Sequence, residues 1–311
     1  MSASNPPPST GQTLLQPLQG IRVLSLALNL PGPAALMRCQ QMGATCSKLE
    51  PLGPNGQSSA DPMQQYSPAA YMQLHQGIEL LQANLKTPTG QAVLHAQLAQ
   101  CDVLLTSFRA AALDKLGLSW EALHAQYPQL CMVRIFGSTA PEDAEHAGHD
   151  LTYQAQAGLV PNGQLPASLF ADMTGAIMAS EAVMQALLVR SQSGYGHYND
   201  VGLAQAAHWL ALPRQWQMTT PNGDVGGAHA GYRMYRCING WVAVAALEPH
   251  FAQRLCSVVE VPISTGSIQQ MREASVHTAI QAFMQRHSHA EISAMAAQSD
   301  IPLQVIPDEH K

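Results

Sequence analysis

Short apolar runs alternate with helix-like segments through the first half of this 311-residue chain. The runs are rich in branched side chains, as is typical of strands buried on both faces of a sheet: 20–28, 44–50, 102–108 and 129–137. The segments between them have helical spacing, and Gly43 and Pro128 act as helix stop signals. Because strands that alternate with helices build parallel sheets, we expect an α/β fold with an open parallel sheet.

The composition of the chain changes along its length and predicts two domains. Residues 1–16 are rich in Pro and Ser, which predicts a disordered tail, and residues 17–190 hold the alternating pattern of a large domain. Residues 191–214 are interpreted as a linker. Residues 215–311 are expected to form a smaller α+β domain, with a hairpin turn at Asn239–Gly240 and helices from there to the end.

Charge and cysteine usage exclude several classes of partner and cofactor. Fifteen basic and 21 acidic residues give a net charge of −6, and no basic block is interleaved with aromatic residues, so no nucleic acid partner is expected. No run reaches the roughly 18 apolar residues of a membrane helix, so no membrane partner is expected. The six cysteines are scattered without a C-x-x-C pair, which favours a reduced, cytoplasmic location. Without a glycine-rich nucleotide motif or a metal-ligand cluster, no metal and no redox cofactor is expected.

The stretch "HAGHDLTYQAQAGL" places His149 beside Asp150, just past an expected strand and before an expected helix. Ligands of open α/β sheets gather at the carboxyl ends of strands, which favours a functional site here. A helix cap by Asp150 and a loop histidine with satisfied hydrogen bonds are the structural alternatives. Two further acids stand at helix starts: Asp172 opens the helical segment 172–190, and Glu248 precedes Pro249.

Nearly the whole chain resembles the class III CoA-transferase family, also called CaiB/BaiF, and is most similar to its α-methylacyl-CoA racemase branch. The resemblance is carried by an ordered set of motifs: "LPGPAA", "QMGATCSKLE", "NLKTPTG", "CDVLLTSFR", "LDKLGLSWEAL", "YPQLCMVRIFG", "AGHDLTYQAQAGL" and "YRMYRCINGWVAVAALEPHF". It implies a Rossmann-like large domain that binds CoA, a small domain, and two subunits interlocked as a homodimer. It also implies an acyl-CoA substrate held between the large domain of one subunit and the small domain of the other, with no cofactor beyond the CoA moiety.

The same resemblance assigns catalytic roles. In the racemases, the residues that match His149 and Asp172 flank the α-carbon of the acyl group, and the residue that matches Glu248 partners the histidine. Inversion needs one group to remove a proton from one face and another to deliver one to the opposite face, and His and a buried Asp can both titrate near neutral pH. Asp150 is expected to support this site, mainly by capping a helix.

Two other functions stay open at this point. In the family's CoA-transferases the aspartate that matches Asp172 is the nucleophile that attacks the thioester. A degenerate paralogue that keeps the fold and dimer without catalysis is the third reading.

The residues that would hold the CoA phosphates are only partly kept. Arg109 and Lys115 match basic positions of the family, whereas Pro51 and the segment His75–Ile78 stand where cations are common in the family. The chain is also expected to hold only the start of the segment that family members send back toward the first domain.

Overall fold

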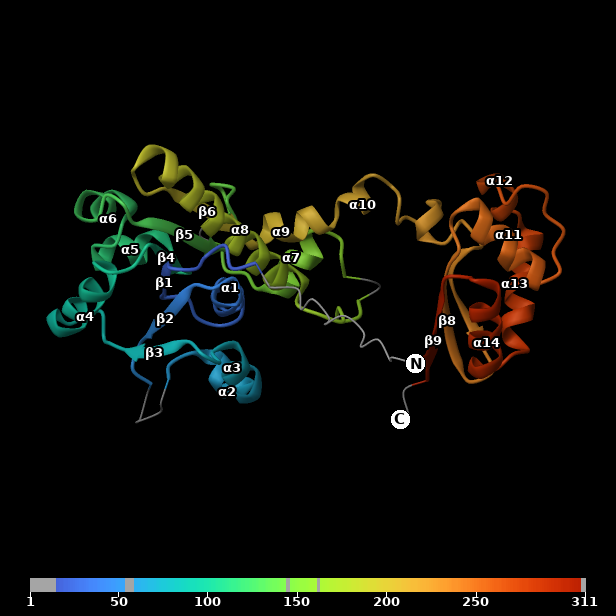
Figure 1. Cartoon of the computed structure of the whole chain (residues 1–311), viewed down its shortest axis with the longest axis horizontal. Coiled ribbons are helices and arrows are strands. Elements are labelled where there is room, and N and C mark those ends of the chain that lie inside the picture. Colours follow the sequence, from blue (N-terminus) through green and yellow to red (C-terminus); the bar gives the residue numbers. More distant parts are fainter. Residues whose placement is uncertain (1–14, 54–58, 144–145, 161–162, 309–311) are drawn as a thin grey trace, which may run out of the picture. The chain divides into compact units, whose positions relative to one another are not determined.

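The computed structural model describes residues 15–53, 59–143, 146–160 and 163–308 (Figure 1). The chain divides into two compact units, Met1–Leu210 and Ala211–Lys311, which we describe separately as the large unit and the small unit. The expected tail, 1–16, lies outside the described residues except for its last two positions. Within the described ranges, no helix is both long and apolar enough to cross a membrane.

The large unit is built on a six-stranded sheet in which every neighbouring pair is parallel. The strands are β1 (Arg22–Ser25), β2 (Thr45–Glu50), β3 (Glu79–Gln82), β4 (Val103–Thr106), β5 (Cys131–Phe136) and β6 (Tyr198–Gly202). They lie in the order β3-β2-β1-β4-β5-β6, which is the Rossmann order. The predicted α/β class with an open parallel sheet is confirmed.

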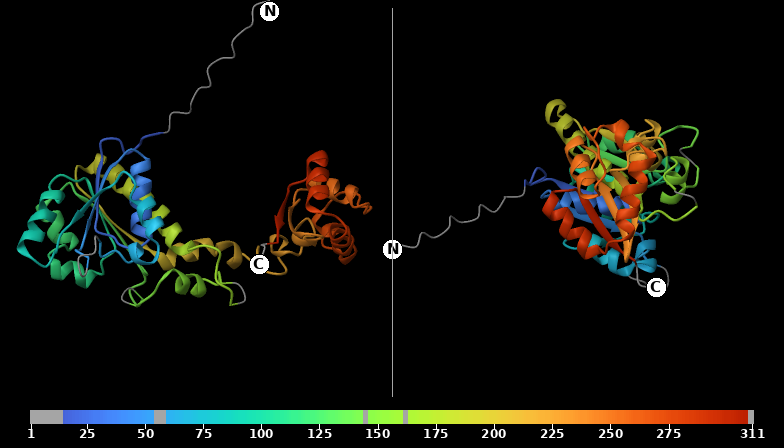
Figure 2. Two further views of the ribbon diagram at one scale, coloured as in Figure 1. Left: turned by 90° about the horizontal axis from the view of Figure 1, so that it is seen from below. Right: turned by 90° about the vertical axis from the view of Figure 1, so that its right-hand side faces the viewer.

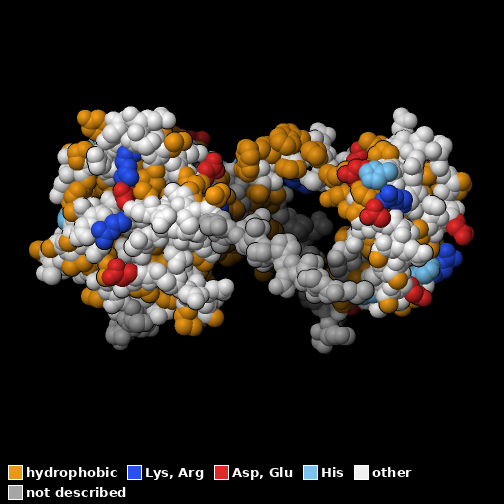
Figure 3. Space-filling view, viewed as in Figure 1, with side chains coloured by type: hydrophobic (Ala, Val, Ile, Leu, Met, Phe, Trp, Pro, Cys, Tyr) orange, Lys and Arg blue, Asp and Glu red, His pale blue; other side chains and the backbone are white. Residues whose placement is uncertain are grey.

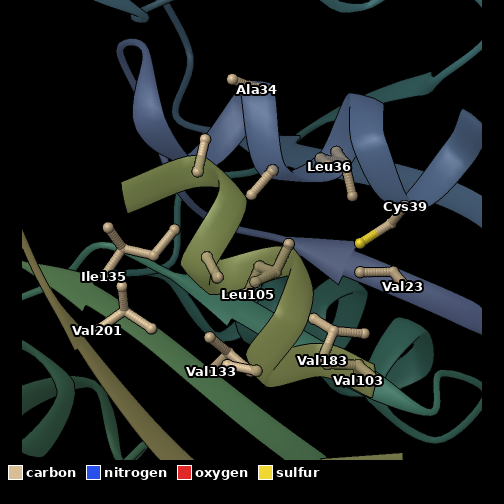
Figure 4. Close-up of a cluster of buried hydrophobic side chains, with 14 of the residues drawn as sticks. Val23, Ala34, Leu36, Cys39, Val103, Leu105, Val133, Ile135, Val183 and Val201 are labelled. Carbon is tan, nitrogen blue, oxygen red and sulfur yellow. The ribbon is translucent and has the colours of Figure 1, made fainter. Parts of the chain in front are cut away.

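Helices cover both faces of this sheet, as Figure 2 shows in its left view. They are α1 (Pro31–Gln41), α2 (Pro62–Tyr66), α3 (Pro68–Leu74), α4 (Pro88–Leu98), α5 (Ala110–Leu116), α6 (Trp120–Gln126), α7 (Asp150–Gln156), α8 (Phe170–Ser193) and α9 (Leu203–Leu210). Alternate strand residues enter two separate cores: Val23 packs with α1 and α8, and the adjacent Leu24 packs with α4, α5 and α6. Figure 4 shows side chains of α1 and α8 meeting those of the central strands in the first core.

The expectation that residues 191–214 form a linker between the two domains is wrong. This segment contains β6, which pairs with β5 as an edge strand, and α9, whose Ala206 and Ala207 are fully buried. The sequence of β6, "YNDVG", is polar because an edge strand is paired on one side only, and this polarity made it resemble a connection. The large unit therefore extends to Leu210.

The small unit contains a three-stranded antiparallel sheet with helices packed on one face, in the order β7-β8-β9. Its elements are α10 (Leu212–Gln215), a 3-10 turn η2 (Asp224–Gly226), β7 (Tyr232–Cys237), β8 (Gly240–Ala245), α11 (Pro249–Val258), α12 (Ile268–Met271), α13 (Ala274–Gln285), α14 (His289–Ser299) and β9 (Leu303–Pro307). The predicted hairpin is confirmed, with its two-residue turn at Ile238–Asn239, one residue earlier than expected. The expectation of helices to the end is wrong, because β9 pairs with β8 as an edge strand.

Candidate active site

Four of the predicted site residues belong to the carboxyl edge of the large sheet. The strand order reverses between β1 and β4, and ligands of open α/β sheets bind at the carboxyl ends beside such a reversal. Arg109 follows β4, and His149 and Asp150 follow β5. Helix α8 leads into β6, which is parallel to the other strands, so α8 begins at the same edge and carries Asp172 in its first turn.

Asp172 is a buried acid whose proton affinity is strongly raised. Its side chain is 7% exposed. Burial, together with the smaller effect of the negative charge of Asp150, raises the pKa of this carboxyl to about 7. A carboxyl with this pKa can both accept and donate a proton near neutral pH, as general acid–base catalysis requires.

Asp150 links the start of α7 to α8, the helix that carries Asp172. It is buried, and its Oδ1 accepts a hydrogen bond of 3.0 Å from the backbone N–H of Asp172. Its Oδ2 accepts a hydrogen bond from the Nε2 of Gln154. Asp150 caps a helix as expected, but the helix is α8, whose first turn its carboxylate binds; the N-cap position of α7 is His149, which has extended backbone angles.

His149 has an exposed side chain on a fixed backbone. Its N–H donates to the Thr152 Oγ1 at 3.0 Å, and the same hydroxyl donates to the His149 carbonyl oxygen at 2.7 Å. The imidazole is therefore presented to solvent from a position next to the Asp150 carboxylate in the chain. This arrangement suits a group that meets a ligand, because its backbone does not depend on the side chain for support.

Tyr153 lies within electrostatic reach of both Asp172 and Arg109. Burial raises the pKa of the Tyr153 hydroxyl, the charge of Asp172 raises it further, and Arg109 lowers it. Arg109 is the N-cap residue of α5, whereas Lys115 lies in its last turn, about 9 Å further along the helix axis at 1.5 Å per residue. Both cations are exposed, and basic side chains on the visible face are scattered rather than gathered (Figure 3). Arg109, but not Lys115, acts on Tyr153, the tyrosine that also responds to the charge of Asp172.

Glu248 belongs to the small unit. It is exposed and stands at the N-cap position of α11, directly before Pro249. Glu248 therefore stands at a helix start, as expected from the sequence, and its role as partner of His149 stays a prediction.

A buried ion cluster was missed in the sequence. Lys48 in β2 is fully buried, and its Nζ lies 2.7 Å from the Glu50 Oε1, 2.6 Å from the Asp61 Oδ2 and 3.0 Å from the His75 Nε2. The His75 Nδ1 lies 2.7 Å from the Tyr71 carbonyl oxygen, so Nδ1 donates and Nε2 accepts from Lys48. The pKa of His75 is lowered, first by burial and then by Lys48. A lysine and a glutamate two residues apart in an expected buried strand were the signal that could have revealed this cluster.

The raised pKa of Asp172 predicts a pH-dependent stability. Between about pH 4 and pH 7 the folded chain holds a proton that the unfolded chain has lost, so this group's contribution to stability is present below pH 4 and is lost as the pH rises through 7. We expect Asp172→Asn, which is neutral at every pH, to be more stable than the parent by about 1–4 kcal/mol at pH 8 and equal to it near pH 4. Urea unfolding at both pH values measures this difference, and an equal difference at the two would contradict it.

A second prediction isolates the charge of Asp150. Asp150→Asn keeps an oxygen that can accept from the Asp172 N–H but removes the negative charge, so the pKa of Asp172 should fall from about 7 while staying above its ordinary value. NMR titration of ¹³C-labelled aspartate carboxyls, assigned with Asp172→Asn, measures the shift. Asp150→Ala should in addition lose about 1 kcal/mol of stability, as expected for a lost helix cap. An unchanged Asp172 titration in Asp150→Asn would show that the two carboxylates do not interact.

Known proteins resemble this chain over most of its length. The model of CoA-transferase family III matches residues 18–310. The chain is 30% identical over 269 residues to a succinate–glutarate CoA-transferase of Agrobacterium fabrum, covering 79% of this chain and 67% of the relative. It is 29% identical over 255 residues to the human alpha-methylacyl-CoA racemase, covering 76% of this chain and 63% of the relative. The matched part thus spans about two thirds of the length of these relatives.

Solved structures show the same fold. A hypothetical protein from Mycobacterium tuberculosis aligns with a TM-score of 0.80 at 21% identity, covering 96% of this chain and 86% of that one. A CaiB/BaiF family protein from Brucella suis aligns with a TM-score of 0.75 at 23% identity, covering 96% and 85% of the two chains. Together with the family match over residues 18–310, these likenesses confirm the resemblance drawn from the motifs. The chain belongs to CoA-transferase family III, the CaiB/BaiF family of enzymes.

Proposed function

We propose that this chain is an acyl-CoA racemase or epimerase that inverts the α-carbon of a 2-methylacyl-CoA thioester by two-base proton transfer. The observation that carries the proposal is the state of Asp172. Asp172 is buried, and its pKa is raised to about 7. Its backbone N–H donates to the carboxylate of Asp150, the residue that follows His149. The carboxyl of Asp172 and the exposed side chain of His149 are thereby supplied from one edge of the sheet.

The proposed chemistry moves protons only. One of the pair His149 and Asp172 removes the α-proton, and the electron pair of the broken C–H bond moves into an enolate whose negative charge lies on the thioester oxygen. The other group then donates a proton to the opposite face, which forms the new C–H bond and restores the thioester. Because both directions of the reaction must run, each group has to serve as acid and as base, which the raised pKa of Asp172 allows for its carboxyl.

The second candidate is a class III CoA-transferase in which Asp172 attacks the thioester. The 30% identity to a succinate–glutarate CoA-transferase supports it. A nucleophile must be an ionised carboxylate, and a pKa of about 7 leaves part of Asp172 ionised and part protonated at neutral pH. Only the racemase needs the protonated form as well, and this favours acid–base work. The retained Asp150–Asp172 pair also argues against a non-catalytic paralogue, because a buried pair of acids destabilises a fold that does not use it.

Three further parts of the proposal rest on the family resemblance. Glu248 is proposed to partner the imidazole of His149, the active form is proposed to be a homodimer, and CoA is proposed to be the only cofactor-like group involved. Sedimentation of the purified chain at sub-micromolar concentration measures its oligomeric state.

Arg109 is the cation that we propose to hold a CoA phosphate. Arg109→Ala is expected to weaken CoA binding by about 1.5–3 kcal/mol, the range for a hydrogen bond to a charged group. The loss should shrink at high salt, because exposed charges are screened. Calorimetric titration with CoA at two salt concentrations measures both effects, with Lys115→Ala as the matched control on the same helix. Equal losses in the two variants would show that Arg109 is not the specific phosphate clamp.

Incubation with a panel of 2-methylacyl-CoA esters in D₂O tests the proposed function. A racemase incorporates deuterium at the α-carbon and interconverts the enantiomers without any acyl acceptor. A transferase turns over only when a carboxylate acceptor is added, and leaves the α-proton in place. Turnover of the second kind alone would reject the racemase.

A further inference from the structure

Asn29 lies at the same carboxyl edge of the large sheet as Asp172. It follows β1 and precedes α1, and both α1 and α8 run from this edge toward the opposite one because each leads into a strand parallel to β1. The Arg38 Nε donates to the Ser180 Oγ at 2.9 Å, which fixes the relative level of the two helices. Arg38 is seven residues past the start of α1, and Ser180 is eight past Asp172, so the start of α1 and Asp172 lie at about the same level.

The backbone of Asn29 is held in a conformation that asparagine adopts at a cost. Its φ is 68°, in the left-handed region that favours glycine. Its N–H donates to both carboxylate oxygens of Asp61, at 3.0 and 3.2 Å. Asp61 is itself fully buried and paired with Lys48 at 2.6 Å. The ion cluster of β2 therefore fixes the position of Asn29, and the strain is compensated by a buried charge.

The side chain of Asn29 is oriented by a tyrosine that the same acid positions. Asp61 caps α2 by accepting from the Met63 N–H at 2.9 Å, and Tyr66 at the end of α2 donates its hydroxyl proton to the Asn29 Oδ1. Tyr66 has a raised pKa, caused first by partial burial and then by the charges of Asp61 and Asp172, so its hydroxyl lies within electrostatic reach of Asp172. With the amide oxygen engaged by Tyr66, the two N–H donors of the Asn29 amide point away from that hydroxyl.

We propose that the side-chain amide of Asn29 donates a hydrogen bond to the thioester carbonyl oxygen of an acyl-CoA whose α-carbon lies at Asp172, and that Tyr66 is the positioning residue for this amide. The inference rests on the proposed function, in which charge develops on that same oxygen. Preorganised donors aimed at a developing oxyanion are among the largest contributions that a site can make to catalysis. Asn29 is thus a substrate-binding residue that also favours thioesters over ligands without the carbonyl.

The test compares two ligands that differ only at the proposed acceptor. Butanoyl-CoA has a thioester carbonyl group, and S-butyl-CoA has a methylene group in place of that carbonyl group. The full-length parent is expected to bind butanoyl-CoA about 3- to 10-fold more tightly, the range for a neutral hydrogen bond. Asn29→Gly suits the positive φ and removes the amide, so it should fold and should weaken butanoyl-CoA alone, bringing the ratio of the two affinities to about 1.

Tyr66→Phe and the double variant separate positioning from structure. Tyr66→Phe should reduce the affinity ratio in part, and the double variant should equal Asn29→Gly, because Tyr66 acts only through the amide. Tyr195→Phe is the matched control: Tyr195 and Tyr66 are both 60% exposed, and we expect the control to keep the parent ratio.

Each outcome of this experiment has a defined meaning. A parent that binds the two ligands equally or binds neither, an Asn29→Gly variant that keeps the ratio, or one that weakens both ligands alike overturns the inference. Deuterium exchange at the α-carbon of the parent reports on the proposed function separately. Loss of the ratio in Asn29→Gly without any exchange in the parent would keep the binding role and reject the racemase.

Discussion

Asp172→Asn is expected to lower racemisation by about 10²–10⁴-fold, the usual contribution of one general acid–base group. His149→Ala should lower it to a similar degree. The two variants should nevertheless differ in a specific way: each keeps the base on one face, so each should still exchange the α-proton of one enantiomer with solvent, and the two variants should favour opposite enantiomers. General unfolding cannot produce this asymmetry.

The measurement is α-proton exchange in D₂O with each enantiomer supplied separately, after circular dichroism has confirmed that both variants are folded. Asp150→Asn serves as the comparison in the same pair of helices, because it keeps both bases and should keep exchange on both faces. Full racemase activity in His149→Ala, with Asp172 still essential and turnover now dependent on an acyl acceptor, would reject the assignment and favour the transferase.

Lys48→Met is expected to destabilise the fold by about 3–5 kcal/mol, the cost of breaking a buried ion pair by removal of one partner. Glu50 and Asp61 are 2% and 0% exposed, so both carboxylates would stay in the interior without their cation. The loss should shrink at low pH, where protonation of the two acids removes the unpaired charge.

Urea unfolding at pH 7 and pH 4.5 measures this effect. Lys86→Met is the matched control, because Lys86 is exposed and its loss should change stability by no more than about 0.5 kcal/mol. A Lys48→Met variant as stable as Lys86→Met would show that the cluster does not hold the sheet edge and would weaken the account of how Asn29 is positioned.

The central part of the fold could be predicted because its signals are local. Strands buried on both faces, such as β4 with four buried residues, appear as continuous apolar runs. The edge strands β6 and β9 lacked this signal. The sequence of β6 is polar, and β9 follows Pro302 and ends at Pro307. Both were consequently interpreted as something else, a linker and a helical terminus.

The sequence could predict individual residues of the candidate site, but it could not predict the contacts between them. The position of Asp172 at a helix start is local information, and the family motifs pointed to it. The partner of Asp150 is not local, because the backbone N–H that it binds lies 22 residues further along the chain. The same holds for Lys48, whose partners Asp61 and His75 come from outside its own strand. A carboxylate before a helix predicts a cap, but the pattern does not say which helix is capped.

The covalent state of Asp172 after contact with substrate separates the two reactions, since a racemase uses this residue for proton transfer and a transferase uses it for covalent attack. We would incubate the purified chain with a single enantiomer of a 2-methylacyl-CoA in D₂O without an acyl acceptor, then measure the mass of the intact protein and of the ester. The account predicts an ester that is racemic and carries deuterium at its α-carbon, together with a protein of unchanged mass. A protein that gains the mass of an acyl or CoA adduct at Asp172, with an ester that keeps its α-proton, would contradict it.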